Sequence, residues 1–363
     1  MSRFSGVALG GAALAVLLVV GVWVERLIPL ELPRPTGPLS VGRTHRALGD
    51  DLTAWIWYPA LHDEPAAPYL PDSVAEEWAH DRPTLINLLT RKLGNVRAHG
   101  VFDAPFAADS ADHPVLLFRG GGGGGTLGYT VHFEELASRG YVVVAVEGGS
   151  GGNPESCVGR PDEDACAARL IDNATVALGS ALDRLSHLPT TDPILGGHID
   201  LSRLGVFGHS FGGAQAFAFC AADARCAAGV NIDGRLFGSL DRVTVTAPFL
   251  WLLSDHGAAR DSISRQIEDR IRRAYERQPS DSRMMAMIKG ANHFAFSEDG
   301  ALLKSGIVRG ILRLVGVLGL DGRRQVEVSA YAVRSFFDAW IRDGDPATVA
   351  LTSPSYPEIV LRQ

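Results

Sequence analysis

A serine that could act as a nucleophile lies in the second half of the chain. Ser210 is the central residue of GHSFG at positions 208–212, which matches the G-x-S-x-G pattern. This pattern places a serine on a strained turn between a strand and a helix, and its glycines let the two elements pack closely. A serine in that position attacks an acyl carbonyl when a neighbouring base removes its proton.

A second stretch, GGSGG at 148–152, also matches this pattern and has Ser150 at its centre. The two serines differ in their surroundings. Ser210 follows the apolar run LGVF and precedes FGGAQAFAF, an order typical of a strand followed by a helix. Ser150 leads into Asn153-Pro154, which begins no helical pattern. We therefore predict that Ser210 is the nucleophile and that Ser150 lies in a loop.

A serine nucleophile needs a base, and in α/β-hydrolases the base follows both the serine and the acid in the chain. Only His256 and His293 follow Ser210. His256 directly follows an aspartate and leaves no room for an acid on a separate strand end. His293 lies in KGANHF, just after the last predicted strand, where such sheets carry their chemistry. We predict that His293 is the general base.

Two aspartates are candidates for the acid that orients this histidine. Asp233 ends the apolar run AAGVNID, and Asp255 ends PFLWLLSD. Both follow a predicted strand and both could accept a hydrogen bond from an imidazole. The usual position in α/β-hydrolases is after the later of these strands, which favours Asp255.

Six consecutive glycines, Gly120–Gly125, follow the buried strand PVLLF. Acyl transfer places negative charge on the carbonyl oxygen, which N–H donors must stabilise. We expect one donor to be the N–H of Phe211 and the other to be the N–H of Gly121 or Gly122, with Gly122 preferred. A phosphate-binding loop would need G-K-[ST] before the next helix. The chain has TLG there instead.

Apolar runs and helical patterns alternate along the chain, which predicts βαβ units. We expect one α/β domain of the α/β-hydrolase fold, with a mostly parallel central sheet and helices on both faces. The predicted strands are 39–48, 51–58, 114–118, 141–146, 204–207, 228–232, 248–253 and 284–288. The predicted helices are 84–93, 129–138, 164–188, 211–222, 261–277 and 326–342, with an amphipathic helix pair in 301–320 beside the mouth of the site or a membrane surface.

The composition excludes several classes of protein. Of the 363 residues 46% are hydrophobic, so the chain is neither disordered nor fibrous. The formal net charge of −7 argues against nucleic-acid binding, for which a basic domain is expected. The 41 glycines are an excess, to which the glycines flanking Ser210 and the run at 120–125 contribute.

The amino-terminal segment is apolar, because residues 6–24 contain no charged side chain. A helix of that length is about 28 Å long, close to the hydrocarbon thickness of a bilayer. Bulky residues follow the segment where a signal-peptide cleavage site would need small ones, which favours a retained anchor over a cleaved signal. We predict an anchor at 1–28, a proline-rich linker at 29–38 and a catalytic domain at 39–363.

The four cysteines form two close pairs, Cys157 with Cys166 and Cys220 with Cys226. Neither pair has CxxC spacing and no histidine cluster accompanies them, so we expect no bound metal. Two local disulfides are predicted, and they agree with export to an oxidising compartment.

Beyond these patterns, the chain resembles the platelet-activating-factor acetylhydrolase family of α/β-hydrolases, in particular its bacterial members. The motifs that carry the resemblance are PTGPLSVG, PVLLFRGGGGG, LASRGYVVVAVE, GHSFGG, AAGVNIDGRLFG, IKGANHFAF and AYAVRSFFDAWI. The resemblance implies that the acid is Asp233, within NIDGRLFG. One departure is Arg119-Gly120-Gly121 where the family usually has Ser-His-Gly, and we expect Arg119 to line the mouth of the site.

The resemblance implies hydrolysis of carboxylic esters with neither metal nor cofactor. The expected substrates are short-acyl esters of lipophilic alcohols or phospholipids, cleaved by Ser210, His293 and Asp233 through an acyl-enzyme. Alternatives are a serine peptidase or acyltransferase on the same fold, or a membrane-anchored binding protein without activity. We expect an extracytoplasmic catalytic domain anchored to a membrane, or secreted if the amino-terminal segment is cleaved.

Overall fold

The structure is a computed structural model. It describes residues 27–49, 51–64, 66–81, 89–90, 92–107, 112–122, 125–149, 153–188, 192–255, 262–303, 306–314, 319–342, 344–345 and 349–362, and also 16, 19–21, 23–24 and 347. Most of the predicted anchor lies outside these residues. Within the described part of the chain, no helix is long and apolar enough to span a bilayer. The anchor therefore stays a prediction.

A ten-stranded mixed sheet forms the centre of the molecule, in the order β13-β12-β11-β10-β9-β7-β8-β3-β2-β6. The strands from β12 to β8 pair in parallel, whereas β3 is antiparallel to both β8 and β2, and β13 is antiparallel to β12. The strands are β2 Ser40–Ala47, β3 Leu52–Ala60, β6 Val101–Phe102, β7 His113–Arg119, β8 Val142–Gly148, β9 Ile199–His209, β10 Cys226–Ile232, β11 Phe249–Leu253, β12 Arg283–Ile288 and β13 Ile359–Arg362. The predicted parallel arrangement is confirmed for the central strands.

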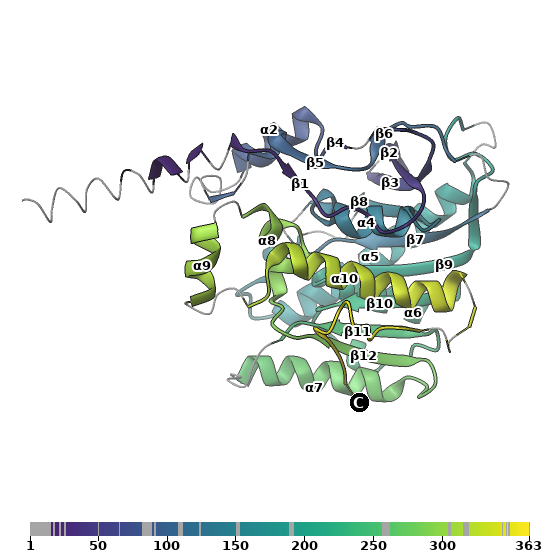
Figure 1. Ribbon diagram of the computed structural model, residues 1–363. Coiled ribbons are helices and arrows are strands. Elements are labelled where there is room, and N and C mark those ends of the chain that lie inside the picture. Colours follow the sequence, from purple (N-terminus) through teal and green to yellow (C-terminus); the bar gives the residue numbers. More distant parts are fainter. Residues whose placement is uncertain are drawn as a thin grey trace, which may run out of the picture.

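Helices cover both faces of this sheet (Figure 1). One apolar core joins α4 and α10 to the sheet, and a second core on the opposite face joins it to α5, α6 and α7. The helices are α2 Asp72–Asp81, α4 Thr130–Ala137, α5 Glu163–Ser186, α6 Phe211–Ala222, α7 Ser262–Arg277, α8 Asp299–Leu302, α9 Gly306–Leu314 and α10 Gly322–Phe337. This is the predicted layered α/β architecture.

The central strands are apolar where both of their faces are buried, as in the second half of β9 and the middle of β7. In β7, Leu116 and Phe118 belong to the core under α4 and α10. Val115 and Leu117 alternate with them and belong to the core under α5 and α6. Strands of this kind end at a common edge, where the loops that follow β7, β9 and β10 meet.

Several elements differ from the prediction. The segment expected to be a helix at 84–93 falls largely outside the described residues; of its described part, Leu89 is helical and Leu93 begins the short helix Leu93–Asn95. Helix α2, which begins twelve residues before that segment, was not predicted. Of the predicted pair at 301–320, α9 lies within the segment, whereas α8 begins before it and overlaps it only at residues 301 and 302; both are short helices. Strand β13 was not predicted, because a short run near the end of the chain pairs with β12 only through the tertiary fold.

The predicted linker at 29–38 lies against the domain. β1 (Leu30–Glu31) joins β5 (Val96–Ala98) and β4 (Ala67–Pro68) in a second, three-stranded sheet. Leu32 is buried in the core under α4 and α10, and the Thr36 hydroxyl donates to Glu135 at 2.7 Å.

Candidate active site

Ser210 lies on the turn between β9 and α6 with a φ angle of +56°. The glycines on either side are required by packing. A Cβ on Gly208 would lie 2.2 Å from the carbonyl oxygen of Gly212, and a Cβ on Gly212 would lie 2.1 Å from that of Arg119. Both distances are far below van der Waals contact, so any side chain there would force β9, α6 and the loop after β7 apart.

The structure brings Ser210, His293 and Asp233 together. His293 Nε2 lies 3.0 Å from Ser210 Oγ, and His293 Nδ1 lies 2.8 Å from Asp233 Oδ2. His293 begins the short helix His293–Phe296 after β12, and Asp233 directly follows β10. These are hydrogen-bond distances, and their order from serine to imidazole to carboxylate matches that of a Ser-His-Asp triad.

Asp233 is buried, and its carboxylate is held by more than the histidine. Oδ1 accepts a hydrogen bond from the Ser254 N–H at 2.8 Å, and Oδ2 accepts one from the Ser254 hydroxyl at 2.6 Å. Burial opposes ionisation of this group, but His293 and Ser254 outweigh it and lower the pKa of Asp233 below its usual value. The carboxylate is therefore charged at neutral pH and able to stabilise an imidazolium.

Asp255 has different partners. Its carboxylate accepts a hydrogen bond from the Gly290 N–H at 2.9 Å, and its own N–H donates to the Ala291 carbonyl at 3.0 Å. It thus fastens the loop that precedes His293. Of the two candidate aspartates, the carboxylate of Asp233, which the family resemblance implied, lies within hydrogen-bond distance of His293. Ser150 and His256 lie outside the described residues.

The predicted oxyanion donors flank Ser210. Phe211 is the first residue of α6, and the first N–H groups of an α-helix have no partner within the helix. Gly121 and Gly122 follow β7, and a Cβ on Gly121 would lie 3.2 Å from Ser210 Cβ. Gly122, Ser210 and Phe211 line the same cavity. This arrangement leaves the Gly122 N–H as the candidate second donor, because the Gly121 N–H donates to the Tyr129 hydroxyl.

A cavity of about 970 Å³ opens at Ser210 and His293. Its volume is at the upper end of the range typical of small-molecule sites. Much of its wall is apolar. This part includes Phe211 from α6, Ile267 from α7, Leu253 from β11, Met285 and Met287 from β12, and Phe237 from the loop after β10. Charged residues such as Glu155, Glu163, Arg235 and Arg272 also line it.

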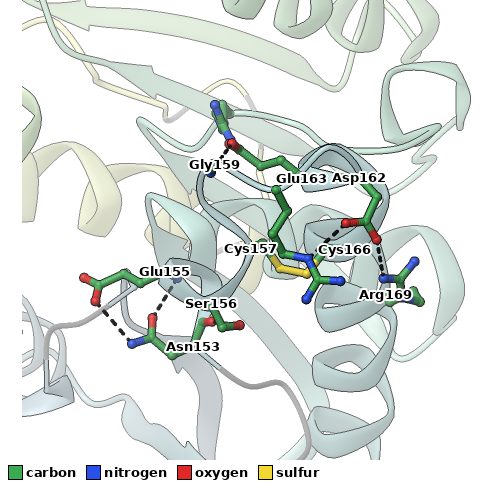
Figure 2. Close-up of a disulfide and its surroundings, with 11 residues drawn as sticks. Asn153, Glu155, Ser156, Cys157, Gly159, Asp162, Glu163, Cys166 and Arg169 are labelled. Carbon is green, nitrogen blue, oxygen red and sulfur yellow. Dashed lines mark hydrogen bonds and ion pairs between the residues drawn. A yellow bond between two sulfur atoms is a disulfide. The ribbon is translucent and has the colours of Figure 1, made fainter.

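One wall of the cavity comes from the loop between β8 and α5, which contains Pro154, Cys157 and Val158. Figure 2 shows this loop and the disulfide Cys157–Cys166, which ties it to the first turn of α5. The side chain of Asn153 accepts a hydrogen bond from the Glu155 N–H at 3.0 Å. Both predicted disulfides are confirmed, the second being Cys220–Cys226 between α6 and β10.

Arg119 does not line the cavity as expected. Its guanidinium donates to the Val146 carbonyl at 2.9 Å and to the Gln215 side chain at 3.1 Å. The carbonyl groups of β8 therefore hold the arginine away from the mouth. Burial lowers the pKa of Arg119, and the nearby Glu147 counteracts this.

Four residues near the site were not predicted from the sequence: Tyr129, His209, Ser254 and Glu298. Ser254 adjoins a candidate aspartate, and His209 occupies the variable position before the serine. Their roles arise from contacts between distant segments, for which the sequence carries no local pattern.

Among the described residues, no group of three or more histidine, cysteine or acidic side chains is arranged to hold a metal ion.

The model of the family described as "Platelet-activating factor acetylhydrolase, isoform II" matches residues 28–151 and 177–339, well over half of the chain. The chain belongs to this family. Members are carboxylic ester hydrolases, and so is this acetylhydrolase-family protein.

Two curated relatives of this family member are similar to it at low identity. A "Probable 1-alkyl-2-acetylglycerophosphocholine esterase" of Arthroderma benhamiae is 24% identical over 274 residues, covering 69% of this chain and 67% of the relative. A "Platelet-activating factor acetylhydrolase" of Cavia porcellus is 23% identical over 336 residues, covering 76% of this chain and 72% of the relative.

A solved structure has the same fold. The ferulic acid esterase from Streptomyces cinnamoneus superposes with a TM-score of 0.72 and 24% identity, covering 92% of this chain and 99% of the other. At this identity the likeness supports the fold alone. The acetylhydrolase-family protein therefore shares its overall architecture with an esterase that is named for ferulic acid.

Proposed function

We propose that this protein hydrolyses short-acyl or lipophilic carboxylic esters through an acyl-enzyme on Ser210. The observation that carries the proposal is the pair of contacts made by His293, at 3.0 Å to Ser210 Oγ and 2.8 Å to Asp233 Oδ2. With the Nδ1 proton donated to Asp233, Nε2 is left as the acceptor that faces the serine hydroxyl.

In the first half of the reaction, His293 Nε2 takes the proton of Ser210 Oγ as that oxygen bonds to the ester carbonyl carbon. The carbonyl oxygen becomes negative and accepts hydrogen bonds from the N–H groups of Phe211 and Gly122. The bond to the alcohol oxygen then breaks, and the proton on His293 passes to the leaving alcohol. Ser210 keeps the acyl group as an ester.

In the second half, water takes the place of the alcohol. His293 removes a proton from the water as its oxygen attacks the acyl carbon, and the same two N–H groups stabilise the oxyanion. The bond to Ser210 Oγ breaks, and the serine regains its proton from His293. The products are the carboxylic acid and a free enzyme. Asp233 remains ionised throughout and stabilises the imidazolium.

The cavity supports a lipophilic substrate. Its apolar wall extends from Phe211, the first residue of α6 just after β9, to Met285 and Met287 on β12, which is three strands away from β9 in the sheet. At the usual spacing between strands this is roughly 14 Å. An acetyl group would fill only the part next to Ser210, so the rest of the wall is available to a longer apolar group of the ester.

The decisive experiment is the replacement of Ser210 by alanine, assayed on p-nitrophenyl acetate. We expect kcat to fall by at least about 10⁴-fold, as for other serine hydrolases that lose the nucleophile. Ser202→Ala is the matched control, because this exposed serine lies near the opposite end of β9. Full activity in the Ser210 variant would refute the proposal.

A panel of p-nitrophenyl esters from acetyl to palmitoyl tests the substrate class. Met285→Trp places a larger side chain in the cavity, so we expect it to lower kcat/KM for octanoyl and longer esters while the acetyl ester is hydrolysed normally. An equal loss on every ester would show that the β12 wall does not hold the substrate. Amide and acyl-acceptor substrates in the same panel test the peptidase and acyltransferase alternatives.

We also propose that residues 1–28 anchor the catalytic domain on the extracytoplasmic side of a membrane. The support is the uncharged stretch at 6–24 and the two disulfides, which suit an oxidising compartment. The full chain should stay with membranes after a carbonate wash, and a variant lacking residues 1–28 should be released. Release of both would refute the anchor.

A further inference from the structure

A chain of hydrogen bonds through two buried side chains, Tyr129 and His209, lies next to Ser210. The Gly121 N–H donates to the Tyr129 hydroxyl at 3.4 Å, and this hydroxyl lies 2.7 Å from His209 Nδ1. On the other side of the ring, His209 Nε2 lies 3.0 Å from the carbonyl oxygen of His293. The chain thus connects the glycine loop after β7 with the loop that carries the proposed base.

The chemistry of the groups sets the direction of every bond in this chain. The carbonyl of His293 can only accept, so the proton of the His209 ring must be on Nε2. A neutral imidazole then has Nδ1 as its acceptor, and the Tyr129 O–H donates to it. The remaining lone pairs of the Tyr129 oxygen accept the Gly121 N–H. Each group therefore has a partner of the right kind.

The pKa values of His209 and Tyr129 are both shifted in the direction that keeps these side chains neutral, as the hydrogen bonds require. His209 is buried, and burial together with the neighbouring His293 lowers the pKa of His209 to about 3. Burial likewise raises the pKa of Tyr129, although the Gly121 N–H counteracts this. The charge of Asp233 favours a protonated His209, but burial and His293 outweigh it. The imidazole and the phenol are both neutral throughout the pH range in which an esterase is assayed.

Close packing holds the chain in place. A Cβ on Gly121 would lie 3.3 Å from His209 Nδ1 and 3.4 Å from the Tyr129 hydroxyl oxygen, so the loop rests directly on these atoms. The His209 ring contacts the rings of His293 and Phe296, with centroids 4.8 and 5.6 Å apart.

We propose that Tyr129 and His209 are positioning residues that set the spacing between the oxyanion-binding loop and the base on either side of Ser210. This inference rests on the proposed function. The Gly122 N–H and the His293 imidazole must both meet the reacting ester group at once, and they come from segments about 170 residues apart in the chain. A misplacement of about 1 Å in such a site can cost about 100-fold in rate.

Tyr129→Phe is the primary test, because it removes one oxygen atom and keeps the ring that packs in the core. It leaves His209 Nδ1 without a donor and the Gly121 N–H without its acceptor. We expect kcat on p-nitrophenyl acetate to fall about 10- to 100-fold with KM changed less than about twofold. Affinity for a trifluoromethyl ketone, which forms a tetrahedral adduct with the serine, should fall with kcat.

Tyr58→Phe is the matched control for the loss of a buried hydroxyl. Tyr58 is also fully buried, and its hydroxyl donates to the Ala104 carbonyl at 2.8 Å in the core on the other face of the sheet. We expect the two variants to lose similar melting temperature, while Tyr58→Phe keeps the wild-type kcat. If Tyr129→Phe also keeps wild-type kcat and ketone affinity, or changes KM alone, the proposal is overturned.

The other half of the chain is tested at His209. Gln in this position can still donate a hydrogen bond to the His293 carbonyl, whereas Leu cannot, so His209→Gln should retain about tenfold more kcat than His209→Leu. Equal activity in two folded variants would count against the proposal. Ser210→Ala, assayed alongside, separates the two questions, since activity without the serine would contradict the proposed function itself.

Discussion

Two buried carboxyl groups, Asp233 and Glu298, have pKa values shifted in opposite directions. Asp233 faces an imidazole and receives two hydrogen bonds from Ser254, and its pKa is lowered. Glu298 lies five residues after His293 and accepts hydrogen bonds from the Val131 N–H and the Tyr69 hydroxyl, both at 2.7 Å. Burial raises the pKa of Glu298 to about 8, and the nearby Glu134 adds to this.

The difference shows that burial alone does not decide the charge of a carboxyl group. Both groups are removed from water, which favours the neutral form. Only Asp233 has a partner that can become a cation. Glu298 has neutral donors and an acidic neighbour, so it is protonated over most of the neutral range and connects α4, α8 and the segment around Tyr69 as an uncharged acid.

Removing the charge of Asp233 should have the largest effect. Asp233→Asn keeps the shape of the side chain but can no longer stabilise an imidazolium, and its amide can favour the wrong tautomer of His293. We expect kcat to fall by about 10⁴-fold with a small change in KM. Steady-state kinetics on p-nitrophenyl acetate measure this, and a loss below tenfold would move the acid elsewhere.

Replacing Glu298 by Gln should not lower the stability of the fold but raise it at high pH. A raised pKa means that the folded protein holds more protons than the unfolded chain between pH 4.5 and about 8. Its free energy of unfolding therefore falls as pH rises through that window. The amide of Gln can accept from Val131 and donate to Tyr69, whose hydroxyl can turn to the Leu127 carbonyl at 3.1 Å.

Urea unfolding of wild type and Glu298→Gln on both sides of this window measures the effect. Above pH 8 the variant should be more stable by on the order of a few kcal/mol, and this difference should disappear below pH 4.5. Parallel curves with a constant offset would show that Glu298 does not titrate as proposed. Glu327→Gln, at a partly exposed position on α10, is the control.

Ser254→Ala sharpens the comparison by making the surroundings of Asp233 less polar. It removes the 2.6 Å hydrogen bond from the hydroxyl and keeps the bond from the backbone N–H. A hydrogen bond to a charged group contributes about 1.5–3 kcal/mol, and we expect a loss of unfolding free energy of that order. Because the hydroxyl lowers the pKa of Asp233, activity should be lost at a higher pH on acidification.

The smallest effect is expected for Asp255→Asn, the second candidate aspartate. The amide oxygen of Asn can still accept from the Gly290 N–H, so the loop before His293 should keep its place. We expect a stability loss of at most about 1 kcal/mol and kcat within about threefold of wild type. A loss of kcat as large as that of Asp233→Asn would reverse the assignment of the acid.

Much of the fold could be predicted from local patterns. Strands buried on both faces are short apolar runs, and β7, β8, β10 and β11 are such runs between helical segments. β13 could not be predicted because it is short and polar at its end, and it exists as a strand only through its pairing with β12.

The candidate site could be predicted only where its residues sit in a motif. The glycines around Ser210 reflect the packing of one turn, and His293 follows the order of elements. The choice between Asp233 and Asp255 depends on which strand end faces His293, and the residues alone favoured Asp255. The contact of Tyr129 with His209 joins residues 80 positions apart and leaves no local pattern.

The contact between Gly122 and Pro154 has a consequence for protein engineering. A Cβ on Gly122 would lie 2.3 Å from Pro154 Cγ, so even alanine does not fit while the disulfide-bonded loop keeps its position. Selectivity for the acyl group therefore cannot be redesigned by single substitutions at Gly122. A library should therefore vary positions 122 and 154 together. The pairs of residues that are tolerated at these two positions should change when the Cys157–Cys166 disulfide is removed.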